Sequence, residues 1–127
     1  MKFADYMKSH PNLGEKTEVY VSVLCCLDKP ETRVFREIKP MKTVLHVCRH
    51  QQIPDDCWVD DAKGHSCSAE WYNGGSPHCI YVSDTIEEAV ADYNMQIQEA
   101  IDLREQQIRN YLNVMEKVVD QLRARKV

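Results

Sequence analysis

Histidines and cysteines with the spacing of metal ligands lie in the middle of the chain. His46, Cys48 and His50 are each two residues apart, and His65 and Cys67 repeat that spacing. Because side chains two apart on a strand share a face, the first three could converge with the second pair from a neighbouring strand. That set would suit zinc. No Cys-x-x-Cys pair accompanies it, and cysteine is often a core residue, so core thiols without any cofactor are the alternative interpretation.

An arginine interrupts an apolar helical pattern near the end of the chain. Arg104 falls on the apolar face of a predicted C-terminal helix, where a guanidinium is costly unless it is paired or hydrogen-bonded. One explanation is an acid of a second chain, such as Glu105 or Asp102. The other is an anionic ligand held between chains, with Arg109 as a second donor.

Aromatic residues that could stack on such a ligand are Trp71, Tyr72 and Tyr81. Core packing is the competing interpretation for Tyr81. Catalysis is not expected, because no nucleophile elbow, phosphate-binding loop or metal-hydrolase pattern accompanies Cys48 and its neighbouring histidines. The candidate residues therefore favour binding over an enzymatic reaction.

The segment that must position Arg104 is one long helix. Residues 83–127 contain no glycine or proline, and their apolar residues recur at steps of three or four, as in a coiled coil. An unbroken helix over residues 84–123 would be about 60 Å long, more than a domain of this size can cover. It must turn back or pack on another copy, so we expect a homo-oligomer. The predicted seam is Ile86, Val90, Tyr93, Ile97, Ile101, Arg104, Ile108, Tyr111, Met115, Val118 and Leu122.

The preceding 83 residues are expected to form a short helix and an antiparallel sheet. Phe3, Tyr6 and Met7 fit one face of a helix that Pro11 ends. Apolar alternation predicts strands over residues 19–27, 32–38, 42–49 and 57–59, with a final pair over 65–72 and 78–83. The predicted fold is α+β: an antiparallel meander of five or six strands in residues 1–83, then one long oligomerisation helix in residues 84–127 that Asp84 caps.

Composition limits the classes of function. The net charge is −4, and residues 51–102 carry eleven acids against Lys63 alone, so binding to nucleic-acid phosphates is not expected. No apolar run reaches the roughly 20 residues of a membrane helix, and residues 1–7 lack the apolar core of a signal peptide. We therefore expect a cytoplasmic protein with no membrane partner and with reduced cysteines.

The passage from a strand ending Tyr81-Val82-Ser83 into a helix opening Glu87-Glu88-Ala89 resembles small phage accessory proteins. Among them the layout is similar to the Thoeris anti-defence proteins that sequester cyclic ADP-ribose signals. The resemblance implies an oligomer in the host cytoplasm with pockets near the subunit contact. It also implies a ring, Tyr81 or Trp71, stacked on adenine and phosphates held by Arg104 and Arg109. These arginines are five apart, so they do not share one helix face as a pair four apart would.

Three functions follow as hypotheses. The first is a non-catalytic homo-oligomeric binding protein, such as an anti-defence sponge for a nucleotide signal. The second is an inhibitor or adaptor that binds a host protein through the acidic surface or the long helix. The third is a zinc-stabilised β domain that serves transcription or nucleic-acid regulation.

Overall fold

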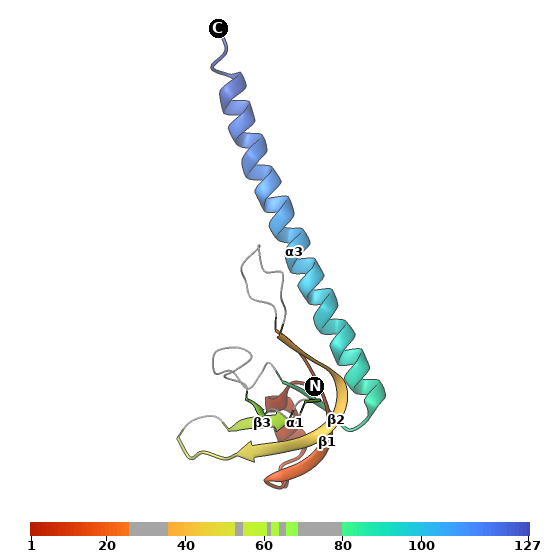
Figure 1. The fold of residues 1–127 in the computed structure, drawn as a ribbon. Helices are drawn as coiled ribbons and strands as arrows, with labels where there is room; N and C mark the ends of the chain where they lie inside the picture. The colour runs from red at the N-terminus through yellow and green to blue at the C-terminus, as the bar shows by residue number, and fades with distance from the viewer. Residues whose placement is uncertain (26–35, 53–54, 61, 64–65, 69–79) are drawn as a thin grey trace.

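The chain forms one antiparallel sheet from which a long helix projects (Figure 1). This computed structural model describes all residues except 26–35, 53–54, 61, 64–65 and 69–79. After helix α1 (Phe3–Ser9) come strands β1 (Lys16–Cys25), β2 (Arg36–Cys48), β3 (Asp56–Asp60), β4 (Ser66–Ser68) and β5 (Tyr81–Ser83), followed by helix α3 (Ile86–Arg123). The predicted α+β fold, an antiparallel sheet followed by one long helix, is confirmed, as is the short N-terminal helix.

Strand β2 is continuous through a proline that was predicted to divide it. Val21 of β1 pairs with Met41, and Val23 pairs with Ile38, so Lys39 and Pro40 together lie opposite the single residue between the two valines. This bulge accommodates the proline, which has no N–H to give to a ladder. The prediction of separate strands over residues 32–38 and 42–49 is therefore wrong.

The last strand, β5, lies beside the first. The sheet order is β4-β3-β2-β1-β5, and Val82 of β5 pairs with Val21 of β1. Strand β5 therefore does not form the predicted final pair with the strand that precedes it along the chain. Backbone bonds also join the N-terminal residues to β5, from the Phe3 N–H to the Ile80 carbonyl and from the Val82 N–H to the Met1 carbonyl.

The two faces of β1 meet different helices. Val19, Val21 and Val23 belong to the hydrophobic core, which also contains Phe3 and Tyr6 of α1. The side chain of Ser22, on the opposite face of the strand, is hydrogen-bonded to α3. The sheet is therefore packed between α1 and the first half of α3. Other core residues are Ile38, Leu45, Val47, Cys57, Val59, Ile80 and Val82.

Helix α3 begins one residue later than predicted. The Thr85 hydroxyl, and not Asp84, caps the helix by accepting the Glu88 N–H at 3.2 Å. The Asp84 carboxylate instead accepts the Tyr6 hydroxyl at 2.7 Å, which joins α1 to the start of α3. Desolvation by burial, followed by this bond and the charge of Asp84, raises the pKa of Tyr6 well above its usual value.

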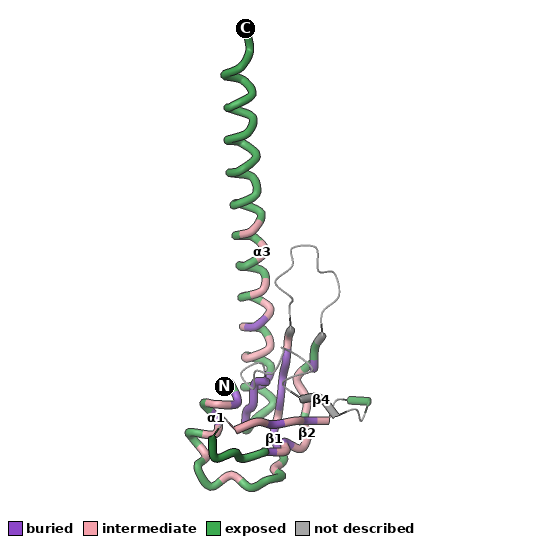
Figure 2. Tube along the Cα trace, turned by 90° about the vertical axis from the view of Figure 1, so that its left-hand side faces the viewer, coloured by how far each residue is buried: buried purple, intermediate pink, exposed green. Residues whose placement is uncertain are grey.

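Only the first half of α3 is packed on the sheet. The helix is unbroken for 38 residues, about 57 Å at ~1.5 Å per residue, so it does not turn back. Ala89 and Gln96 are its buried residues, and every residue from Ile108 to Val127 is exposed (Figure 2). The predicted seam is displaced at its start, because Ile86 and Val90 are exposed and the neighbouring Ala89 faces the sheet instead.

Candidate functional site

A buried glutamine of α3 is hydrogen-bonded to strand β1. The Gln96 Oε1 accepts the backbone N–H of Leu24 at 2.8 Å, and its Nε2 donates to the Ser22 hydroxyl at 3.1 Å. Among the described residues, the pairing of β5 with β1 reaches Ser22, and Gln96 satisfies a strand N–H two residues farther along β1. A side chain of α3 therefore continues the hydrogen bonding of the sheet edge.

A groove of about 410 Å³ lies beside this contact, where α3 passes the ends of β1 and β2. Its floor is apolar, and the charged residues that line it within the described part of the chain are Arg104, Glu37 and Glu105. Arg104 is half-buried and donates to the Gln107 Oε1 at 3.0 Å. The described residues that line the groove are Leu24, Glu37, Tyr93, Ile97, Ala100, Ile101, Arg104 and Glu105.

Farther along α3, side chains of the helix itself line a second hollow of about 360 Å³. Arg104 lines both hollows, so one side chain joins the groove at the sheet to the exposed half of the helix. The other residues around the second hollow are Gln107, Ile108, Tyr111 and Leu112. The groove and the exposed apolar face of α3 therefore form one continuous surface.

A tyrosine and a carboxylate close the groove at the sheet. The Tyr93 hydroxyl of α3 donates to the Glu37 carboxylate of β2. This bond, together with burial and the charge of Glu37, raises the pKa of Tyr93 to about 12. The neutral phenol is the form that makes the bond, so the contact is stable at neutral pH.

The Tyr93 contact predicts a loss of stability in alkaline solution. A tyrosine in the unfolded chain titrates near pH 10, below the pKa of folded Tyr93. The stabilising contribution is therefore complete below about pH 10 and is lost as the pH rises through about 12. In urea titrations, Tyr93→Phe should lose less stability than the wild type between pH 9 and 11.5. Identical pH profiles for the wild type and Tyr93→Phe would contradict this assignment.

The structure does not bring the two predicted arginines together. Arg109 is exposed and donates to the Gln106 Oε1 at 3.0 Å, whereas Arg104 bonds to Gln107. Five residues of α-helix turn the chain by roughly 500°, so the two side chains leave the helix in different directions. Arg109 does not line either of the two hollows described above.

Of the predicted stacking residues, the structure describes only Tyr81, which does not join Arg104. Tyr81 is buried in β5, where it pairs with Ser22, and does not line the groove. Burial, followed by the charges of Glu99, Asp92 and Asp5, raises the pKa of Tyr81. This placement supports the core interpretation of Tyr81. Trp71 and Tyr72 lie outside the described residues.

The predicted metal ligands are only partly described. The His46 ring stacks on Trp58 of β3, with ring centroids 3.4 Å apart, while Cys48 is exposed at the end of β2 and His50 follows it. Within the described part of the chain, no three His, Cys, Asp or Glu side chains gather as a metal site. His65 and the side chain of Cys67 lie outside that part, so the five-residue zinc set stays a prediction.

Sequence reasoning missed Gln96, which bonds α3 to β1 beside the groove, and Glu37, which lines the groove. The position of Gln96, one residue before the apolar Ile97, was a weak sign that its side chain is buried. The group that it binds, the Leu24 N–H, can be identified only from the folded sheet. Glu37 lies on a strand far from α3 in sequence, and no spacing rule connects the two.

No known protein family, no curated protein and no solved structure matches this chain. Among the described residues, no helix combines the length and apolar character needed to cross a membrane. The functional argument therefore depends on the geometry of α3 and its groove.

Proposed function

We propose that this protein is a non-catalytic, homo-oligomeric binding protein that assembles through the exposed half of α3. The observation that carries the proposal is a row of large apolar side chains that begins at the groove and runs along that half, which we call the assembly stripe. Each is between 40% and 65% exposed in the single chain. The stripe consists of Ile101, Ile108, Tyr111, Leu112, Val114, Met115, Val118, Val119 and Leu122.

The spacing of the stripe favours another helix as its partner. Ile101, Ile108, Met115 and Leu122 are seven residues apart and occupy the a positions of a heptad, while Arg104, Tyr111 and Val118 occupy the d positions. Leu112 and Val119 extend the stripe beyond a strict a/d seam. An apolar row of this size in water is typical of an interaction surface.

A second copy is the partner best suited to this surface. The same stripe is present on each copy, so a two-fold arrangement covers both at once. The polar residues Asn110, Asn113 and Lys117 lie on the opposite side of the helix, where they would stay in water. Assembly also places the groove beside the subunit contact, because Arg104 lines both surfaces.

Sedimentation equilibrium at micromolar concentration tests the proposal. We expect a mass of at least two chains at low micromolar protein. A monomer throughout this range would contradict assembly and would favour a different protein as the partner of the stripe.

Capture of a phosphorylated nucleotide in the groove stays a prediction of the resemblance alone. The charged residues described at the groove are one arginine and two carboxylates, Glu37 and Glu105. This balance does not favour an anion, and we do not include a nucleotide in the proposed function.

A further inference from the structure

We infer that two copies pair with their α3 helices antiparallel. The C-terminal end of each helix then lies against the acidic part of the other helix, where that helix leaves its sheet. This inference depends on the proposed assembly and specifies its direction. It follows from the opposite charges at the two ends of the exposed half-helix.

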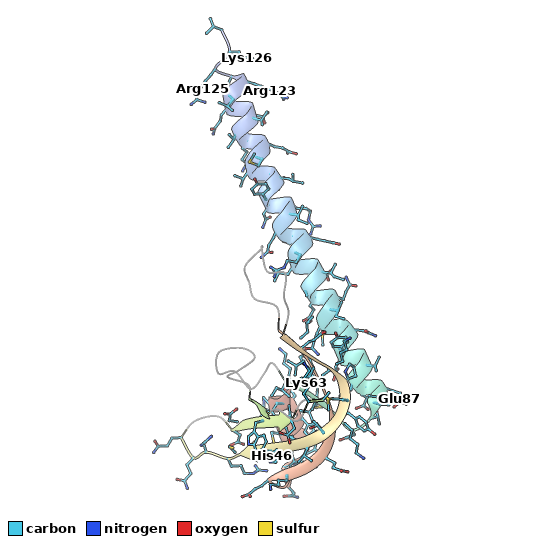
Figure 3. The ribbon with its side chains drawn as sticks, in the orientation of Figure 1. His46, Lys63, Glu87, Arg123, Arg125 and Lys126 are labelled. Carbon is cyan, nitrogen blue, oxygen red and sulfur yellow. The ribbon has the colours of Figure 1, made fainter. Side chains whose placement is uncertain are left out.

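The far end of α3 is basic. Arg123, Arg125 and Lys126 lie together at that end, away from the sheet (Figure 3). Arg123 is 4.0 Å from Asp120, and the Arg125 side chain donates to the Gln121 carbonyl. The three cations, which we call the basic tip, therefore exceed the nearby acids.

The root of the exposed half is acidic. Glu99, Asp102 and Glu105 are exposed where α3 leaves the sheet, and Glu37 of β2 lines the adjoining groove. The nearest cation on that part of the helix is Arg104. The acidic root consists of Glu37 and Glu105, which line the groove beside the stripe, with Asp102 and Glu99 farther round the helix, and Glu37 and Glu105 are the acids placed to meet the basic tip.

An antiparallel pair brings these two ends together in a register that also fits the stripe. When Tyr111 lies beside Met115 of the partner subunit, Ile108 lies beside Val118 of the partner subunit. Arg104 then lies beside Leu122 of the partner subunit, near the negative end of that helix. In this register residues 123–127 of one copy lie beside residues 99–103 of the other, next to the groove that α3 forms with the ends of β1 and β2.

A parallel pair would place like charges together. Each Arg104 would face Arg104 of the partner subunit in one layer, and the two basic tips would lie side by side. Like charges on adjacent helices repel each other, and in a parallel pair the acids of the root would lie far from the basic tip. The charge pattern therefore favours the antiparallel direction.

Neutralising the basic tip distinguishes the two directions by the sign of its effect. In the triple variant Arg123→Gln, Arg125→Gln and Lys126→Gln, an antiparallel pair loses attraction at both ends. We expect the dimer Kd, measured by sedimentation equilibrium at 50 mM salt, to rise roughly ten- to a hundredfold. Raising the salt to 0.5 M should weaken the wild type more than the variant.

A matched control removes charge elsewhere on the same helix. Arg109→Gln with Lys117→Gln takes away two cations outside the tip and should change the Kd less than threefold. Circular dichroism should show an unchanged helix content in each variant. A Kd that falls, or stays the same, in the tip variant would overturn the antiparallel direction while leaving assembly intact. A monomeric wild type would instead contradict the proposed function itself.

Discussion

Replacing Ile108 and Met115 with glutamate should convert the assembly into folded monomers. Both residues occupy a positions in the centre of the assembly stripe and do not contact the sheet, since every residue beyond Gln107 is exposed. In the assembly, each glutamate would remove apolar contact and place an unpaired charge between helices, at a cost of several kcal/mol per charge. We expect the Kd to rise at least a hundredfold, which corresponds to about 2.7 kcal/mol.

The control for this variant carries the same added charge on the polar side of the helix. Gln106→Glu with Asn113→Glu should leave the assembly near its wild-type affinity, because both positions lie away from the stripe. Glutamate is a good helix former, so both double variants should keep their helices. Association that survives in the Ile108→Glu/Met115→Glu protein would show that the stripe is not the contact surface.

Replacing Gln96 with leucine should destabilise the fold itself by about 2 kcal/mol. The substitution keeps a similar volume but leaves the Leu24 N–H and the Ser22 hydroxyl without the partners they have now. Polar groups left unsatisfied away from water cost about 1–3 kcal/mol, and part of this cost is relieved where water can reach the strand end. Urea unfolding monitored by circular dichroism measures the difference in the free energy of unfolding.

Gln98→Leu is the matched control for Gln96→Leu. Gln98 lies two residues away, is exposed and bonds only to Asp102 among the contacts described for it. Its replacement should change the free energy of unfolding by less than about 0.5 kcal/mol. Equal stability of the two variants would mean that Gln96 does not anchor α3 to the sheet.

The elements defined by local pattern could be predicted from the sequence. The absence of glycine and proline after Ser83, with apolar residues at helical spacing, predicts α3 because a helix depends on bonds within one segment. The apolar alternation at Val19, Val21 and Val23 likewise predicts β1. The apolar residues beyond Ile101 also identify the face of α3 that the sheet leaves exposed.

Contacts between distant segments could not be predicted from such patterns. The pairing of β5 with β1 depends on which strand edge is open once the sheet forms. Pro40 was expected to end a strand, yet a bulge opposite Ser22 removes the need for its N–H. The cap at Thr85 was missed because Asp84 is occupied by Tyr6, a residue far away in sequence.

The sequence by itself determined that this protein contains a long amphipathic helix with more apolar surface than one small domain can cover. Periodicity and composition act within a segment, so they can be read directly. Only the tertiary structure decided how far along α3 the sheet buries the helix. It also decided that Gln96 bonds the helix to the end of β1, and that Arg104 lies where the groove meets the assembly stripe. These features depend on how separate segments pack, because burial and hydrogen-bond partners are properties of the folded chain and not of local spacing.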